Sequence, residues 1–302
     1  MKTLFTGAGV ALITPFNKDG SVNYEYLGRL IDYQIENGTD ALIICGTTGE
    51  GSTIHFDERV KVFDYSVKRT NGRVPVIAGT GSNSTDYTIS LAKAAEEVGV
   101  DAHLVVTPYY NKTSQRGLVV HYTTIADNVE KPIIIYNVPS RTGINVKPET
   151  YAELAKHPNI IATKEANGNL SEMLKTRYLC GDNLDIYVGN DDQVAVSTAI
   201  GAKGVISVLS NVLPQYTHDM TMYGVNGETA KCAEMQLRVL PLIEDLFCDV
   251  NPIPVKDIMN LYGAEVGGFR LPLCSMSDEL LAAVEKRLEP FKAELIAEMK
   301  KI

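Results

Sequence analysis

The chain has 302 residues, of which 45% are hydrophobic and 22% charged, and its 37 acidic and 28 basic side chains give a formal net charge of −9. This composition excludes a disordered chain, a collagen and a small disulfide scaffold. The acidic balance argues against nucleic acid and anionic membrane surfaces, which would need a dense field of Lys and Arg. A small molecule is therefore the expected partner.

The length suits a single α/β domain of about 250 residues with a remnant of roughly 50. We expect a cytoplasmic protein, because no segment has the pattern of a signal peptide and no stretch approaches the ~20 apolar residues of a membrane span. The 5 cysteines contain no Cys-x-x-Cys pair and predict free thiols in a reducing compartment. The 5 histidines lack the spacing of zinc ligands, so no metal is expected.

Short apolar runs alternate with helical patterns along most of the chain. Eight runs predict strands, at 9–13, 41–45, 74–78, 103–107, 133–138, 160–164, 186–189 and 204–208. Apolar residues between them follow the helical period, as in 26–37, 57–70, 85–98 and 148–156. This repeat predicts an α/β fold, a TIM (β/α)8 barrel with parallel strands covered on both faces. A doubly wound sheet is the alternative, although such sheets more often have about five to seven strands.

The pattern changes near residues 224–227, and only helical patterns follow, at 229–247, 255–261 and 278–300. Pro254 suits a first helical turn, Ser277 suits a helix cap, and Pro290 predicts a kink or break. We therefore expect a catalytic barrel over 1–226 and a C-terminal α-helical domain over 227–302.

In such a barrel the active site lies at the carboxyl ends of the strands, and Lys164 ends the sixth predicted strand. Burial there would lower the pKa of the amine and make it nucleophilic enough to form a Schiff base with a carbonyl. The alternative is an ion pair with Glu165. Successive strand residues point to opposite faces, which favours the nucleophile.

Three further side chains at this rim carry suitable chemistry. Tyr136 ends the neighbouring strand, so its phenol lies within reach of the Lys164 amine and can exchange protons. Thr47 and Thr48 lie between glycines and offer hydroxyls and backbone N–H groups to a carboxylate. Arg141, in the loop after the fifth strand, offers a bidentate guanidinium. Interior packing, a tight turn and a solvated loop Arg are the respective alternatives.

Together these motifs resemble the dihydrodipicolinate synthase (4-hydroxy-tetrahydrodipicolinate synthase) family of pyruvate-dependent class I aldolases, over almost the whole chain. The motifs are Gly-Thr-Thr-Gly-Glu at 46–50, Tyr-Tyr-Asn at 109–111, Tyr-Asn-Val-Pro-Ser-Arg-Thr-Gly at 136–143, Lys-Glu-Ala at 164–166 and Asn-Pro-Ile-Pro-Val-Lys at 251–256. The resemblance implies a lyase of diaminopimelate and lysine biosynthesis. Such an enzyme condenses pyruvate with L-aspartate-4-semialdehyde through an imine on Lys164, without a cofactor.

The resemblance also implies roles for single residues. Tyr136 would shuttle protons, and Thr48 would relay them to Tyr110, which projects from a neighbouring subunit of a homotetramer built as a dimer of dimers. Backbone groups near Thr47 and Thr48 would hold the pyruvate carboxylate. Arg141 would bind the semialdehyde carboxylate. Gly189 and Ile206 would line the pocket.

Two other functions and one regulatory property complete the expectations. N-acetylneuraminate lyase shares the barrel and the Lys, but typically has an aliphatic residue where Arg141 stands; a non-catalytic barrel sensor is a more distant alternative. In members inhibited by lysine, His and Glu residues line the effector cleft. The matching positions here are Phe56, Arg59 and Tyr87, with Tyr109 and Asn83 retained. We therefore expect weak or absent lysine inhibition.

Overall fold

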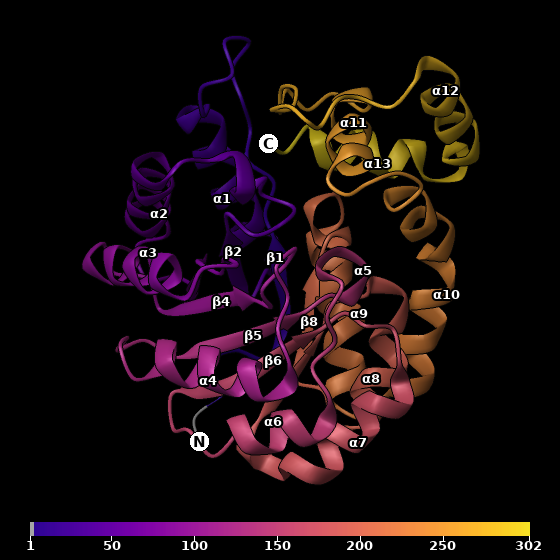
Figure 1. Cartoon of the computed structure of the whole chain (residues 1–302). Coiled ribbons are helices and arrows are strands. Elements are labelled where there is room, and N and C mark those ends of the chain that lie inside the picture. Colours follow the sequence, from indigo (N-terminus) through magenta and orange to yellow (C-terminus); the bar gives the residue numbers. More distant parts are fainter. Residues whose placement is uncertain (1–2) are drawn as a thin grey trace.

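The computed structural model describes residues 3–302 and shows a closed barrel of parallel strands surrounded by helices (Figure 1). Each strand pairs with its neighbours in sequence, and β1 pairs with β8 to close the barrel. The strands are β1 (Gly7–Ala11), β2 (Ala41–Ile44), β3 (Val76–Gly79), β4 (Ala102–Val106), β5 (Ile133–Asn137), β6 (Ile160–Glu165), β7 (Asp185–Val188) and β8 (Gly204–Ser207). The closure confirms the predicted barrel, and the doubly wound alternative is wrong.

The helices of the barrel follow the strands along the chain. They are α1 (Tyr24–Glu36), α2 (Phe56–Thr70), α3 (Thr85–Glu97), α4 (Gln115–Ala126), α5 (Pro139–Thr142), α6 (Pro148–Leu154), α7 (Leu170–Cys180), α8 (Val194–Ala199) and α9 (Pro214–Val225). Side-chain oxygens of Asn23, Ser84, Ser114 and Asn169 cap four of these helices by accepting a backbone N–H. Arg141 lies in α5 and not in the loop expected from the sequence.

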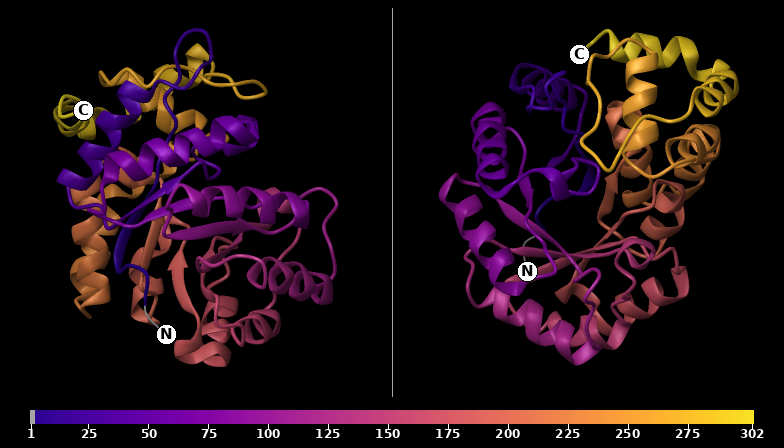
Figure 2. Two further views of the ribbon diagram at one scale, coloured as in Figure 1. Left: turned by 90° about the vertical axis from the view of Figure 1, so that its left-hand side faces the viewer. Right: turned by 45° about the horizontal axis from the view of Figure 1, so that its top comes forward.

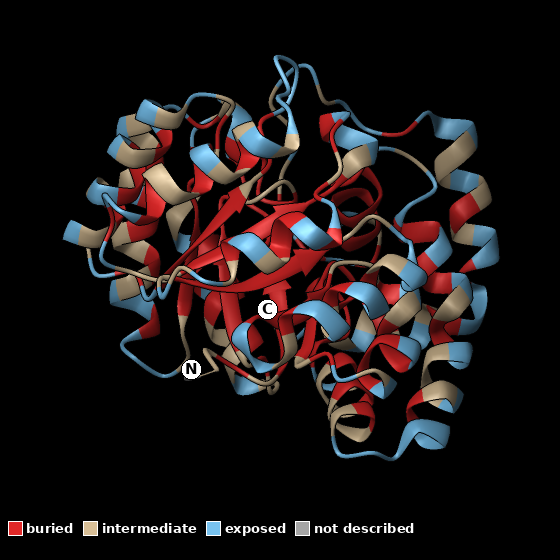
Figure 3. Ribbon diagram, turned by 60° about the horizontal axis from the view of Figure 1, so that its bottom comes forward, coloured by how far each residue is buried: buried red, intermediate tan, exposed pale blue. Residues whose placement is uncertain are grey.

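The alternation of side chains along the strands sorts them between the barrel lumen and the outer layer. Tyr136, Ala162, Tyr187 and Ile206 share one core cluster in the lumen. A view with the bottom brought forward shows the buried strands surrounded by helices with exposed outer faces (Figure 3). Because Lys164 is two residues after Ala162 on β6, its side chain points to the lumen as well.

Four helices follow the barrel: the first runs along its side next to α8 and α9, and the other three lie at the end away from the N-terminus (Figure 2). They are α10 (Thr229–Leu246), α11 (Ile253–Leu261), α12 (Asp278–Arg287) and α13 (Lys292–Met299). Pro254 is in the first turn of α11, and the Ser277 hydroxyl accepts the Leu280 N–H at the start of α12. Pro290 stands in the short turn that separates α12 from α13, so all three local predictions are confirmed.

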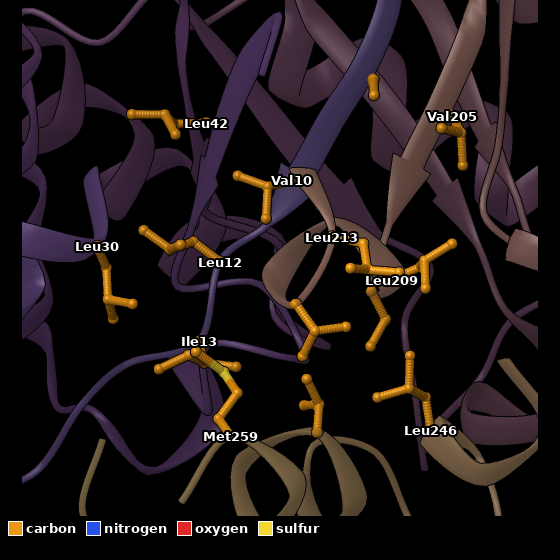
Figure 4. Close-up of a cluster of buried hydrophobic side chains, with 14 of the residues drawn as sticks. Val10, Leu12, Ile13, Leu30, Leu42, Val205, Leu209, Leu213, Leu246 and Met259 are labelled. Atoms are coloured by element: carbon orange, nitrogen blue, oxygen red, sulfur yellow. The ribbon is translucent and has the colours of Figure 1, made fainter. Parts of the chain in front are cut away.

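The C-terminal helices share a hydrophobic core with the barrel. Leu246 and Met259 belong to the same buried cluster as Leu12 and Ile13, and the close-up shows them gathered beneath the strands (Figure 4). The expected boundary between 226 and 227 falls in the turn between α9 and α10. Of the helices in residues 3–302, none combines the length and the apolarity needed to cross a membrane.

Candidate active site

Lys164 and Tyr136 lie side by side near the carboxyl ends of β6 and β5. They are register partners in the parallel pair, and the Lys164 Nζ is 4.5 Å from the centre of the Tyr136 ring. Both side chains are buried, with 5% of Lys164 and 7% of Tyr136 exposed. The barrel therefore places an amine and a phenol together in the lumen, as the spacing of the strands predicted.

Glu165 points to the opposite face of β6 and is not the ion-pair partner of Lys164. Its carboxylate accepts hydrogen bonds from Asn137 Nδ2 at 2.9 and 3.2 Å, from Tyr151 Oη at 2.9 Å and from the Asn167 backbone N–H at 3.0 Å. Burial raises the pKa of Glu165 to about 7, although these hydrogen bonds oppose the rise. The network ties the ends of β5 and β6 together behind Tyr136 and Lys164.

The raised pKa of Glu165 predicts a pH-dependent contribution to stability. A carboxyl whose pKa rises on folding from the ordinary 4.5 to about 7 stabilises the fold fully below about pH 4.5, and this contribution is lost as the pH rises through 7. Between about pH 5 and 8 the unfolding free energy should therefore fall by on the order of 3 kcal/mol through this group. Urea unfolding of Glu165→Gln should lack this component.

The other titratable groups are the same in both proteins, so only the difference between wild type and variant is interpreted. Glu153, which is exposed on α6, provides the matched control as Glu153→Gln and should keep the wild-type pH dependence. Equal pH dependence in wild type and Glu165→Gln would contradict the assignment.

The structure separates the two threonines of the Gly-Thr-Thr-Gly-Glu loop. Thr47 lines a cavity of about 650 Å³ that Tyr136 and Arg141 line as well. Thr48 is 2% exposed, and its hydroxyl accepts a hydrogen bond from Asn251 Nδ2 at 3.0 Å. The sequence predicts the proton relay at Thr48, but of the two threonines it is Thr47 that lines the cavity together with Tyr136, while the Thr48 hydroxyl is engaged by Asn251.

Asn251 is a residue whose part in the site the sequence analysis missed. Its backbone carbonyl accepts a hydrogen bond from Arg141 Nη2 at 2.9 Å, while its side chain holds Thr48. Asn251 thus positions both the Arg141 guanidinium and the Gly-Thr-Thr-Gly-Glu segment at 46–50, which is called the threonine loop below. Its motif is visible in the sequence, but a contact between residues 110 positions apart leaves no local signal.

The remaining predicted residues lie around this centre at different depths. A side chain at Gly189 would place its Cβ 3.0 Å from Lys164 Cε, so only glycine leaves room beside the amine. Ile206 is fully buried in the lumen cluster. Tyr110 is brought into no contact with them: its side chain is 91% exposed, on a residue with a φ of 69°.

Asp191, after β7, is a second buried group that the sequence analysis left without a role. One of its oxygens accepts the backbone N–H groups of Val208 and Leu209 at 2.9 and 3.0 Å, which fixes the turn after β8. Burial raises the pKa of Asp191, and the nearby positive charge of Lys164 acts in the opposite direction. Asp191 therefore connects the loop after β7 to the turn after β8.

A metal site needs several His, Cys, Asp or Glu side chains close together. Within residues 3–302, no three His, Cys, Asp or Glu side chains come together in a way that could hold a metal ion. The site geometry is instead that of an amine, a phenol and a guanidinium around one cavity.

Comparisons with known proteins agree on one family. The model of the dihydrodipicolinate synthetase family matches residues 4–290. The curated 4-hydroxy-tetrahydrodipicolinate synthase of Caldicellulosiruptor bescii is 53% identical over 95% of this chain and 97% of its own length, and that of Clostridium novyi is 48% identical over 96% and 97%. The crystal structure of dihydrodipicolinate synthase from Aquifex aeolicus superposes with a TM-score of 0.92 at 43% identity, covering 95% of this chain and 98% of that one.

Proposed function

Because the chain belongs to the dihydrodipicolinate synthetase family, we propose that it condenses pyruvate with L-aspartate-4-semialdehyde, the committed step of diaminopimelate and lysine biosynthesis. The observation that carries this proposal is the Lys164 amine in the barrel lumen, 4.5 Å from the Tyr136 ring. An amine held there can form an imine with the keto carbon of pyruvate, and the barrel excludes bulk water around it.

The chemistry needs proton transfers at each step, and Tyr136, whose ring lies beside the Lys164 amine, can make them. The Lys164 amine adds to the pyruvate carbonyl, the carbinolamine loses water, and the resulting imine loses a methyl proton to become an enamine. The enamine carbon then attacks the aldehyde carbon of the semialdehyde, which re-forms the imine. The amino group of the semialdehyde attacks this imine, closes the ring and displaces the Lys164 amine. Tyr136 donates and accepts these protons, and Thr47 relays them to the cavity. The covalent imine takes the place of a cofactor.

Substrate recognition falls to a few positive groups, since both substrates are anions and the chain is acidic. Backbone N–H groups near Thr47 and Thr48 hold the pyruvate carboxylate, with Gly189 and Ile206 as the wall around the imine. Arg141, held by the Asn251 carbonyl, binds the carboxylate of the semialdehyde. This guanidinium supports the synthase over an N-acetylneuraminate lyase, and the buried Lys and Tyr pair supports an enzyme over a non-catalytic barrel.

The choice of aldehyde acceptor tests this function. In a coupled assay with pyruvate, L-aspartate-4-semialdehyde should be turned over, while N-acetylmannosamine should give no product above background. Turnover of N-acetylmannosamine alone would assign the chain to the lyase. If neither acceptor gives a product, the proposed activity is refuted.

Arg141→Gln should weaken the second substrate selectively. Losing a charge-assisted, bidentate contact with a carboxylate should raise the KM for the semialdehyde by roughly tenfold or more. Trapping of pyruvate by borohydride should continue, because Lys164 and Tyr136 are untouched. Arg29→Gln, on the exposed face of α1, is the matched control. An unchanged KM would show that another group binds this carboxylate.

We extend the proposal to a homotetramer that assembles as a dimer of dimers. Tyr110 is too exposed to act in its own subunit, which supports its insertion into the cavity of a second copy across the tight interface. Leu170, Leu174 and Tyr178 form an exposed apolar stripe at helical spacing on α7, which suits the second interface. The free cysteines support a cytoplasmic location.

Lysine should inhibit this protein weakly or not at all. Arg59, Tyr87 and Asn83 line the main cavity, and none of its lining residues within 3–302 is Asp or Glu. The ammonium groups of lysine would meet a guanidinium where they need a carboxylate. Initial rates measured against lysine check this, and half-inhibition at submillimolar lysine would contradict it.

A further inference from the structure

Two buried polar side chains stand directly behind Tyr136 and Lys164. In the pairing of β5 with β6, Tyr136 is opposite Lys164, and the next residues along, Asn137 and Glu165, are opposite each other. Successive residues of a strand point to opposite faces, so Asn137 and Glu165, called the outer pair below, lie on the outer face of the barrel wall. Both are buried, and the Asn137 amide donates to both Glu165 oxygens, at 2.9 and 3.2 Å.

The pairing of β5 with β6 is irregular near its amino end. Between Ile133 and Ile134 of β5 the register shifts, and β6 has one extra residue there. Beyond such a bulge, contacts farther along the strands must fix the register of the remaining residues. A slip by one residue would turn the Lys164 side chain from the lumen to the outer face. The outer pair is the side-chain contact that fixes the register at the carboxyl end, where Lys164 stands.

The outer pair is anchored from the side away from the lumen. The Tyr151 hydroxyl of α6 donates to Glu165, and the Asn137 side-chain oxygen accepts the backbone N–H of Val146 at 3.2 Å. Asn137 Nδ2 also donates to Asn145 Oδ1 at 2.8 Å, so both ends of the amide are engaged and its orientation is fixed. The main cavity formed by the described residues is lined by neither member of the outer pair, so both act through their neighbours.

We propose that Asn137 and Glu165 are positioning residues for the imine chemistry, which hold the Tyr136 phenol beside the Lys164 amine from the outer face of the barrel wall. The inference rests on the proposed function, in which Tyr136 moves protons during imine formation. Proton transfer depends steeply on geometry, and a misplacement of about 1 Å can lower a rate by about 10²-fold. Loss of the outer pair should therefore slow imine formation and leave the binding of the substrate carboxylates unchanged.

Glu165→Leu tests the outer pair, because it nearly keeps the size of the side chain and removes both acceptor oxygens. Both kcat and the rate at which borohydride traps pyruvate on Lys164 should fall at least tenfold. The KM for the semialdehyde should stay within about twofold of wild type, since Arg141 is untouched. Asn137→Leu removes the donor from the other strand and should give the same losses, so the test does not depend on the folding of one variant.

Two milder variants separate positioning from stability. Glu165→Gln keeps one acceptor oxygen for Asn137 and should retain rates close to those of wild type. Tyr151→Phe removes the hydrogen bond from α6 to Glu165 but leaves the bond between Asn137 and Glu165 in place. It should lower the urea midpoint and keep kcat and the trapping rate close to those of wild type.

Formaldehyde gives a measurement that does not depend on pyruvate recognition. With cyanoborohydride it methylates amines through an imine, and mass spectrometry can compare Lys164 with the exposed Lys18 of the same chain. Relative to Lys18, methylation of Lys164 should be at least tenfold slower in Glu165→Leu than in wild type. If wild type traps no pyruvate, the proposed function fails, and the formaldehyde rates still decide whether the outer pair positions the amine and the phenol.

The positioning role is refuted if Glu165→Leu and Asn137→Leu keep the wild-type kcat and methylation rate. It is also refuted if Tyr151→Phe loses as much kcat as Glu165→Leu, because the loss would then follow stability. Equal losses in Glu165→Gln and Glu165→Leu would show that the hydrogen bond from Asn137 does not set the rate.

Discussion

Replacement of Lys164 by Ala should abolish covalent trapping of pyruvate and lower kcat by about 10³-fold or more, because it removes the amine that forms the imine in the lumen. The side chain is 5% exposed and lies against the Tyr136 ring on the neighbouring strand. Incubation with pyruvate and borohydride, followed by mass spectrometry, should show one adduct per wild-type chain and none in Lys164→Ala.

The control for this experiment is a lysine at the other rim of the barrel. Lys203 immediately precedes β8, so it stands at the amino ends of the strands, where no chemistry is expected. Lys203→Ala should keep both the adduct and the activity. An adduct that persists in Lys164→Ala, mapped to another residue, would overturn the assigned nucleophile and with it the proposed function.

Lys256→Met should destabilise the protein by about 3–5 kcal/mol, the cost of breaking a buried ion pair by removing one partner. Lys256 and Glu50 are both fully buried, and their Nζ and Oε1 atoms are 2.7 Å apart. The ammonium also donates to the backbone carbonyls of Thr14, at 3.1 Å, and Gly268. The pair joins α11 to the threonine loop, so its loss should be measured both as a lower urea midpoint and as reduced activity.

An exposed ion pair provides the comparison. On the surface of α2, Lys68 Nζ is 2.7 Å from Asp64 Oδ2. Lys68→Met should lower the unfolding free energy by less than about 1 kcal/mol. The double variant Lys256→Met/Glu50→Gln should recover part of the lost stability, because no unpaired buried charge is left behind. If Lys256→Met and Lys68→Met lower the stability by similar amounts, the Lys256–Glu50 ion pair does not hold α11 to the threonine loop.

Much of the fold was predictable because its signals are local. Each strand is a short apolar run bounded by turn residues, and Ser277, Pro254 and Pro290 mark their helices through capping and backbone restriction alone. The neighbourhood of Lys164 and Tyr136 was predictable as well, since the ends of consecutive parallel strands must be adjacent. The short helix that carries Arg141 was missed, because its four residues are too few to show a helical period.

The sequence by itself determined the barrel, the lumen amine and its phenol neighbour, because strand periodicity and strand order specify which side chains share a face. Only the tertiary structure decided which of the two threonines lines the cavity and which residue holds Arg141. These depend on contacts such as those of Asn251 and Lys256 with the threonine loop, more than 200 residues away. No local pattern records such contacts, since they exist only once the C-terminal helices have packed onto the barrel.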